Sequence, residues 1–210
     1  MSRLTFFKKN RQLLFLYYFW LVTIVVVVFL GLSFVSQARA AIVVGDLRGN
    51  ITLQFVYDYE CPYCHHLYQA LQQVLDHEKH IKVKLYPVAV INQTSLMAAT
   101  AAIVATHYPN AFIQYTNMLM LHSPLSPPEI WQVLNSRGLN KPAFLQDMHS
   151  FWVKDQLLEG LTLLHKYHVK SVPLLIISTD HGKSTALMGE QTPAALEKAI
   201  QHIRTASPIE

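Results

Sequence analysis

Phe55-Val56-Tyr57-Asp58-Tyr59-Glu60-Cys61-Pro62-Tyr63-Cys64 is the stretch that decides the fold of this 210-residue chain. Residues 51–57 are rich in β-branched and aromatic side chains and predict a strand that leads directly into the C-x-x-C motif. Apolar residues recur at helical spacing after the motif, and Pro62 is compatible with a first helical turn, where its missing amide hydrogen has no internal partner. The motif is therefore expected at a strand-to-helix junction, with Cys61 at the helix N-terminus.

The chain has two cysteines, and both belong to this motif. A small protein in an oxidising compartment usually uses several cysteines for structural disulfides. A disulfide that closes a loop with only two intervening residues restrains the unfolded chain little and adds little stability. A redox role is therefore favoured over a structural role for Cys61 and Cys64.

The first forty residues differ in composition from the rest of the chain. Basic residues precede an uncharged, mostly apolar run from Leu13 to Val35, and Ala38-Arg39-Ala40 follows. This order is typical of a cleavable signal peptide, although a run that spans about 35 Å as a helix is also long enough for a membrane anchor. In both cases the basic residues are expected to stay cytoplasmic, which places the functional domain in the periplasm or another extracytoplasmic space.

The net charge of +4 comes from this N-terminal segment. Residues 1–40 contain five of the 17 Lys and Arg residues and none of the 13 Asp and Glu residues, so the remaining chain has a formal charge of −1. Binding of nucleic acid requires positive charge to neutralise phosphates. A nucleic-acid partner is therefore not expected.

The remaining sequence predicts a sheet with helices packed on it. A second strand is expected from Ile81 to Val90, with Pro87 indicating its end or an edge position. A helical insertion of roughly 75 residues follows, at about residues 92–169. Further elements are expected as helices at 95–108, 111–121, 129–135 and 143–168, strands at 172–177 and 184–188, and a last helix capped by Thr192.

The combination of C-P-Y-C after a strand, a helical insertion, a downstream Val172-Pro173 and a terminal helix resembles the DsbA-like branch of the thioredoxin superfamily. The resemblance covers about residues 48–205. It implies an α/β, thioredoxin-like fold with a helical insertion subdomain, within a domain of residues 41–210. It also implies that Pro173 is cis and that Val172 contacts the substrate backbone.

Two positions depart from the pattern of this family. Gln54 and Phe55 stand where relatives often have a buried acidic residue, and Leu174 follows the proline where Thr is common. The resemblance therefore does not supply the acid of a proton shuttle in this strand.

The position of Cys61 favours its thiolate. Unpaired amide N–H groups and the helix dipole lower the pKa of a cysteine at a helix N-terminus. Asp58 and Glu60 would oppose this effect if they were ionised and close, whereas a protonated His65 could face Cys61 from one helical turn away. A solvent-facing His65 is the more ordinary interpretation, and Cys64 is expected to be the buried partner.

These features predict an exported thiol-disulfide oxidoreductase, an enzyme that needs neither a cofactor nor a metal. The expected catalytic residues are Cys61 and Cys64, and the motif and substrate-contact candidates are Pro62, Tyr63, His65, Val172 and Pro173. A disulfide oxidase is favoured over an isomerase or reductase, because Val172 resembles the oxidase branch and isomerases often need a preceding dimerisation module. The expected partners are unfolded or partly folded exported proteins with cysteines and, by family analogy, a membrane quinone-linked oxidant.

Three other classes of protein are compatible with parts of the sequence. C-P-Y-C-H also matches a c-type haem attachment site. A zinc site could combine the two cysteines with two nearby histidines from His65, His66, His77 and His80. A non-catalytic peptide-binding protein could use the insertion as a groove, lined by Met97, Met118, Met120 and Met148.

Overall fold

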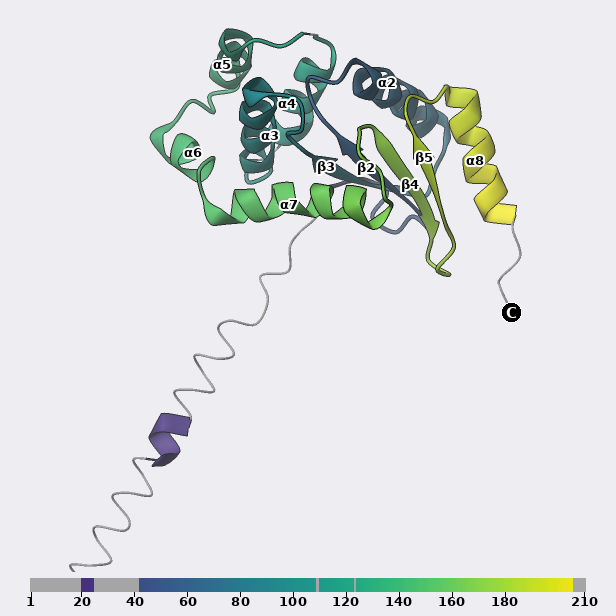
Figure 1. Ribbon diagram of the computed structural model, residues 1–210, viewed down its shortest axis with the longest axis horizontal. Coiled ribbons are helices and arrows are strands. Elements are labelled where there is room, and N and C mark those ends of the chain that lie inside the picture. The colour runs from purple at the N-terminus through teal and green to yellow at the C-terminus, as the bar shows by residue number, and fades with distance from the viewer. Residues whose placement is uncertain (1–19, 25–41, 109, 123, 206–210) are drawn as a thin grey trace, which may run out of the picture. The chain divides into compact units, whose positions relative to one another are not determined.

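The computed structural model describes residues 20–24, 42–108, 110–122 and 124–205 (Figure 1). The chain divides into two compact units, residues 1–39 and 40–210. Residues 20–24 are helical, and the rest of the expected signal peptide or membrane anchor lies outside the described residues. Within the described ranges, no helix has both the length and the apolar character that a membrane span requires.

In residues 42–205, as far as the structure describes them, the strands form one mixed sheet of five in the order β1-β3-β2-β4-β5. The strands are β1 (Ile42–Gly45), β2 (Ile51–Tyr57), β3 (Ile81–Pro87), β4 (Leu174–Thr179) and β5 (Ser184–Met188). β2 is central, since it pairs in parallel with β3 and antiparallel with β4. A central strand is covered on both faces, which explains why Phe55 and Val56, on opposite faces, are both fully buried.

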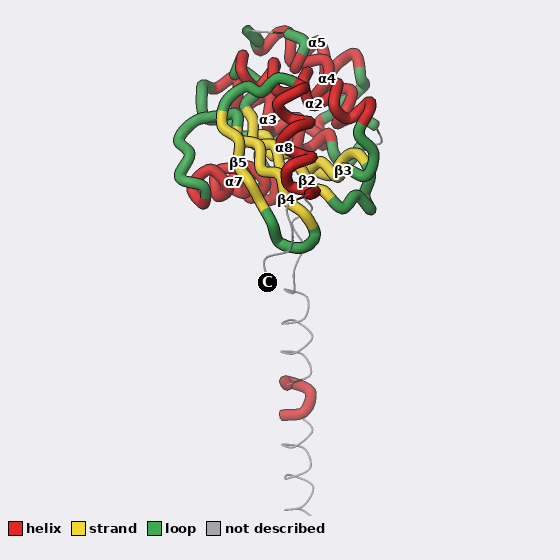
Figure 2. Tube along the Cα trace, turned by 90° about the vertical axis from the view of Figure 1, so that its right-hand side faces the viewer, coloured by secondary structure: helices red, strands yellow, loops and turns green. Residues whose placement is uncertain are grey.

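Helices cover both faces of the sheet (Figure 2). α2 (Pro62–His77) and α8 (Pro193–Thr205) contribute to the main hydrophobic cluster, which includes Phe55 and Leu175. α7 (Phe151–Lys166) packs on the opposite face, where Leu164 joins Val56 and Ile176 in a second cluster. This arrangement of strands and helices confirms the predicted α/β fold class.

The predicted helical insertion corresponds to five helices between β3 and β4. α3 (Gln93–Ala105), α4 (Ala111–Met120), α5 (Pro127–Ser136) and α6 (Pro142–Asp147) precede α7. The buried alanines of α3 belong to the same hydrophobic cluster as the α2 face of the sheet. The insertion and the sheet therefore share one core.

α7 approaches the end of β3 closely at Gly160. A Cβ atom at this position would lie 2.4 Å from Cγ1 of Val88. Glycine lowers helix propensity, but here it allows the helix backbone to pack against the chain that follows β3.

Several expected elements have different bounds in the structure, two of them for a clear physical reason, and one strand was missed. The expected helix at 143–168 is interrupted at residues 148–150, where the amides of His149 and Ser150 bond to carbonyls three residues earlier and Ser150 adopts an extended backbone. The strand expected to reach Val90 ends at Pro87, which has no amide hydrogen to continue the ladder. β1 was not expected, because four residues are too short for a periodic signal and its pairing with β3 is not local.

Candidate functional site

The C-x-x-C motif lies at the expected strand-to-helix junction. β2 ends at Tyr57 and α2 begins at Pro62. Cys61 is the N-cap residue of α2, with an extended backbone at φ −89° and ψ 111°. Its side chain therefore lies beside the free amide groups of the first helical turn.

The two cysteines are free thiols that differ in exposure and acidity. Cys64 is fully buried, as expected, whereas Cys61 keeps 5% of its surface exposed. The hydrogen bond from Cys64 lowers the pKa of Cys61 to about 7, against the effect of burial, and the backbone N–H groups of Cys64 and Tyr63 lower it further. Burial, together with the hydrogen bond to Cys61, raises the pKa of Cys64. The expected lowering for Cys61 is confirmed, with Cys64 as its largest cause.

The chain before β4 completes the surroundings of Cys61. The Val172–Pro173 peptide bond is cis, as the resemblance implied. Sγ of Cys61 donates a hydrogen bond to the carbonyl oxygen of Val172 at 3.6 Å, although the two residues are 111 positions apart. Pro173 is buried and Val172 is half-buried. The fold thus brings both residues beside the nucleophile candidate.

Pro62 and Tyr63 form the exposed part of the motif. Both side chains are open to solvent, and Tyr63 has 58% of its surface exposed. The two residues between the cysteines are therefore open to solvent, while Cys64 is covered.

The solvent-facing interpretation of His65 is wrong. Only 5% of this residue is exposed, and Nε2 of its ring lies 2.6 Å from the carbonyl oxygen of Tyr59. Since Tyr59 lies in the turn between β2 and α2, His65 fixes this turn from the first part of the helix. The exposed histidine is His66, whose Nδ1 is 2.6 Å from Oε2 of Glu190.

Asp58 places a buried carboxylate beside the motif. Oδ1 accepts a hydrogen bond from the Glu60 amide at 2.9 Å, and Oδ2 accepts bonds from the Val90 and Ile91 amides at 2.8 and 3.2 Å. The side chain is fully buried. As expected for a nearby anion, it raises the pKa of Cys61, although it is the smallest of the causes.

Glu60 connects the motif with two places in the insertion, the start of α3 and the chain between α4 and α5. Oε1 accepts a hydrogen bond from the Leu125 amide at 2.8 Å, in the chain between α4 and α5. Oε2 accepts a bond from Nδ2 of Asn92, the N-cap of α3, at 3.3 Å. The sequence assigned Glu60 only a possible effect on Cys61, because its partners are 32 and 65 residues away.

A chain of buried hydroxyl groups lies next to the motif. Tyr57 and Tyr59 are joined through their hydroxyl oxygens at 3.1 Å, and Tyr59 is joined to Oγ1 of Thr116 on α4 at 2.8 Å. The sequence indicated Tyr57 only as a strand residue and gave Tyr59 no role beyond its place in the stretch that leads into the motif. Alternating tyrosines at the end of a buried strand are a signal for such a network, since buried hydroxyl groups need partners.

The positions of the histidines and methionines argue against the c-type haem, zinc-site and peptide-groove interpretations of the sequence. A c-type haem needs the histidine of C-P-Y-C-H as an iron ligand, but the ring of His65 is buried and bonded to Tyr59. In the described ranges, no group of three or more His, Cys, Asp or Glu side chains could hold a metal ion. The four methionines of the expected peptide groove do not form one surface, because Met120 is in the core whereas Met97 and Met148 line a separate cavity.

The sequence matches the thioredoxin-like domain family over residues 39–204. The chain belongs to this family. A protein of Haemophilus influenzae that carries the name "uncharacterized protein" is 29% identical over 137 residues, which cover 61% of this chain and 57% of that relative. The match thus spans little more than half of the length of that relative.

Solved structures show the same fold. A thioredoxin-like oxidoreductase from Silicibacter pomeroyi has 21% identity and a TM-score of 0.72, and the match covers 81% of this chain and 95% of that one. A periplasmic thioredoxin-like protein from Salmonella enterica serovar Typhimurium has 20% identity, a TM-score of 0.69 and coverages of 81% and 93%. The thiol-disulfide exchange protein alpha-DsbA2 from Wolbachia pipientis has 17% identity, a TM-score of 0.67 and coverages of 77% and 86%. These structures confirm the thioredoxin-like, DsbA-like fold that the motif indicated.

Proposed function

We propose that this chain is an extracytoplasmic thiol-disulfide oxidoreductase that donates a disulfide to folding proteins through Cys61 and Cys64. The observation that carries the proposal is the difference between the two thiols, with the pKa of Cys61 lowered to about 7 and that of Cys64 raised. A stabilised thiolate favours the reduced pair and makes the corresponding disulfide a better oxidant. The names of the Silicibacter and Wolbachia proteins, an oxidoreductase and a thiol-disulfide exchange protein, support the same class.

The reaction consists of two exchange steps. A substrate thiolate attacks Sγ of Cys61 in the oxidised pair, the Cys61–Cys64 bond breaks, and Cys64 leaves as a thiolate that takes up a proton because of its raised pKa. A second substrate thiolate then attacks the substrate sulfur of the mixed disulfide. Cys61 leaves as the thiolate that its surroundings stabilise. The substrate loses two electrons and gains a disulfide, and the two cysteines of the protein gain both electrons.

The residues around Cys61 have positioning roles in this proposal. The Val172 carbonyl lies within hydrogen-bond distance of Sγ of Cys61, and Pro173 joins Val172 to the start of β4. Exposed Pro62 and Tyr63 border the nucleophile and would contact the substrate backbone or side chains. Buried His65 supports the turn that carries the motif and does not contact substrate.

The proposed domain arrangement places this chemistry outside the cytoplasm. Residues 1–40 act as a signal peptide or membrane anchor, and residues 41–210 form the catalytic domain, with the helical insertion at about 92–169. The periplasmic thioredoxin-like protein of Salmonella supports this location. The substrates are exported proteins with cysteines, and a membrane quinone-linked oxidant restores the disulfide by accepting the two electrons.

Single cysteine substitutions test the mechanism. Cys61→Ser should abolish oxidation of a reduced, unfolded substrate, because the attacked sulfur is missing. In Cys64→Ser, the Cys61 thiolate should attack a substrate disulfide, release the second substrate sulfur as a thiolate and accumulate as a mixed disulfide that is visible on non-reducing gels and by mass spectrometry. The two variants control for each other, because each removes one of the two cysteines of the chain and a different result is expected from each. Full oxidation activity in either variant would contradict the proposal.

The direction of electron flow is tested by the thiol state in the native compartment. Rapid acid quenching, alkylation and mass analysis give the fractions of oxidised and reduced motif. A predominantly oxidised pair supports a disulfide donor. A predominantly reduced pair supports the alternative function, an isomerase or reductase.

A further inference from the structure

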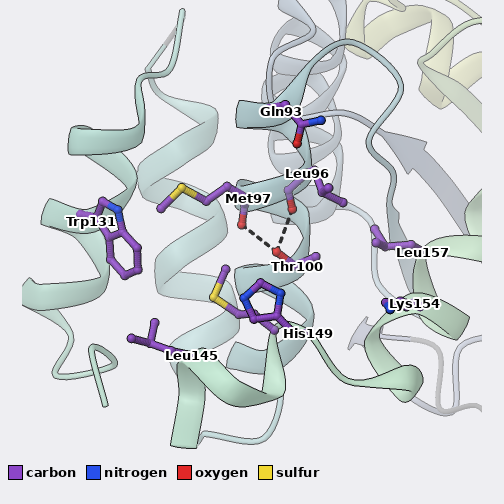
Figure 3. A pocket seen from close by; sticks show the side chains of 10 residues that line it. Gln93, Leu96, Met97, Thr100, Trp131, Leu145, His149, Lys154 and Leu157 are labelled. Atoms are coloured by element: carbon purple, nitrogen blue, oxygen red, sulfur yellow. Dashed lines mark hydrogen bonds between the residues drawn. The ribbon is translucent and has the colours of Figure 1, made fainter. Parts of the chain in front are cut away.

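The helical insertion contains a cavity of about 550 Å³ that is separate from the thiol pair (Figure 3). α3 provides one wall, and α5, α6 and α7 provide the others. Its volume is within the range of about 300–1,000 Å³ typical of pockets for small molecules. Neither cysteine of the motif lines it.

Most of the cavity surface is apolar. Figure 3 shows Trp131 from α5 facing Met97 from α3, with Leu145 from α6 below Trp131 and Leu96 on the far side of Met97. Met148, in the turn between α6 and α7, and Leu157, on α7, complete the apolar lining. Thioether side chains adapt to ligands of irregular shape. This surface suits a flexible alkyl chain or an aromatic ring.

Thr100 does not need a polar partner from a ligand. Its hydroxyl group donates to backbone carbonyls of α3, those of Leu96 at 2.8 Å and Met97 at 3.1 Å. These two bonds appear as dashed lines in the middle of Figure 3. An apolar ligand can therefore lie against Thr100 without leaving its hydroxyl group unsatisfied.

The charged and titratable groups of the cavity are basic. Lys154 and His149 belong to its lining, and none of the ten lining residues is acidic. The ammonium group of Lys154 lies 5.3 Å from the centroid of the exposed Phe151 ring, and both Lys154 and His149 are open to solvent. An anionic group at this rim could bind Lys154 while the apolar part of the same ligand enters the cavity.

We propose that this cavity binds an amphipathic carboxylate, a molecule with an alkyl or aryl chain and one acidic group. The chain occupies the space between Trp131 and the two methionines, and the carboxylate pairs with Lys154. The side of α3 from Gln93 to Thr100 spans about 10 Å, at about 1.5 Å per residue, which matches a medium-length alkyl chain. This binding site goes beyond the proposed thiol-disulfide exchange and does not depend on it.

Photoaffinity labelling of the full chain tests the site. The probe is dodecanoic acid with a diazirine near the end of its alkyl chain, and labelled positions are mapped by mass spectrometry. We expect labels on the segments that contain Met97, Trp131 and Met148, and suppression of these labels by unmodified dodecanoate. Dodecanol, which has the same chain without the charge, should compete more weakly.

Two variants and one control separate the effect of charge from that of shape. Lys154→Gln should reduce labelling about two- to fivefold, the range expected for loss of one solvent-exposed ion pair. Lys166→Gln, which removes another exposed lysine of α7 outside the cavity, should leave labelling unchanged. Leu145→Trp should fill the cavity and suppress labelling, with circular dichroism as a check of folding.

Three results would overturn the proposal. The first is labelling that maps away from the cavity, and the second is equal competition by dodecanol together with unchanged labelling of Lys154→Gln. The third is competition by a cysteine-containing substrate peptide but not by dodecanoate, which would assign the cavity to a substrate side chain.

Discussion

The two thiols of the motif occupy one helical turn but have opposite shifts in acidity. Because the pKa of Cys61 is lowered to about 7, its thiolate is half-formed at neutral pH. The rate of Cys61 alkylation by iodoacetamide in the reduced protein should therefore rise with pH around a midpoint near 7. Cys64, buried and with a raised pKa, should stay unmodified in the folded protein. Peptide mapping after timed alkylation measures both rates, and a midpoint near the ordinary value of 9.0 would contradict this account.

The lowered pKa of Cys61 makes the stability of the reduced protein depend on pH. Between pH 7 and pH 9 the unfolded Cys61 keeps its proton while the folded residue has lost it, so the stability of the reduced protein should rise with pH in this window and fall as pH drops through 7. The raised pKa of Cys64 acts in the opposite sense and weakens the rise near pH 9. The oxidised protein has no thiols in the motif and is the control in urea unfolding.

Asp58 combines a structural role with an electrostatic one. Asp58→Asn replaces the oxygen that accepts the Val90 and Ile91 amides, or the one that accepts the Glu60 amide, with an NH₂ group. Hydrogen bonds to a charged group contribute about 1.5–3 kcal/mol. We therefore expect the free energy of unfolding, measured in urea, to fall by an amount of this order. Loss of the negative charge should also move the alkylation midpoint of Cys61 below that of the unmodified protein.

A matched substitution distinguishes this site from a general effect of removing an acid. Asp76→Asn changes an exposed carboxylate on α2 and should alter neither stability nor the alkylation midpoint. Equal stability of the Asp58→Asn and Asp76→Asn proteins would show that the three amide bonds of Asp58 contribute little.

At the scale of elements, Glu60 joins the start of α3 and the connection between α4 and α5 to the motif. Glu60→Gln keeps the size of the side chain but leaves only one oxygen for two donors. We expect the free energy of unfolding to fall by about 0.5–1.5 kcal/mol, the usual contribution of one hydrogen bond. Hydrogen exchange should show faster exchange of the Leu125 amide, with Glu197→Gln on α8 as the control. Unchanged protection of Leu125 would exclude Glu60 as the connection between these elements.

The elements that the sequence predicted are those with local signals. β2 and α2 meet at the motif because their side-chain patterns and Pro62 act over neighbouring residues. α5 begins with another local feature, a capping box in which the amide of Ser126 donates to Oε2 of Glu129 at 2.7 Å. These features depend on residues a few positions apart.

The features that the sequence did not predict depend on distant partners. β1 exists through its pairing with β3, and Asp58 is held by amides 32 and 33 residues away. The ring of His65 binds the Tyr59 carbonyl across the turn, which helical spacing alone does not indicate. The two cysteines of the site were therefore found from the motif, whereas its supporting side chains required the folded structure.

At the scale of the whole molecule, the buried hydroxyl chain connects the sheet with the insertion. Tyr57 and Tyr59 come from β2 and the turn after it, and Thr116 comes from α4. Burial raises the pKa of both Tyr57 and Tyr59, so their hydroxyl groups stay neutral. Because Tyr59 lies two residues before Cys61, the contact between α4 and the sheet is made directly beside the motif.

A double-mutant cycle measures the coupling between Tyr57 and Tyr59 within this chain of hydroxyl groups. Tyr59→Phe removes the middle hydroxyl group, so the buried hydroxyl groups of Tyr57 and Thr116 lose their partner. The free energy of unfolding should fall by about 2 kcal/mol. Tyr57→Phe preserves the bond between Tyr59 and Thr116 and should cost about 1 kcal/mol. The double variant should be more stable than the sum of the two losses predicts, by about 1 kcal/mol, since no hydroxyl group of Tyr57 remains to be left unpaired. Urea unfolding of the reduced proteins measures the cycle, with Tyr108→Phe at a half-buried ring as the control. Strict additivity would mean that the hydroxyl groups of Tyr57 and Tyr59 contribute to stability independently of each other.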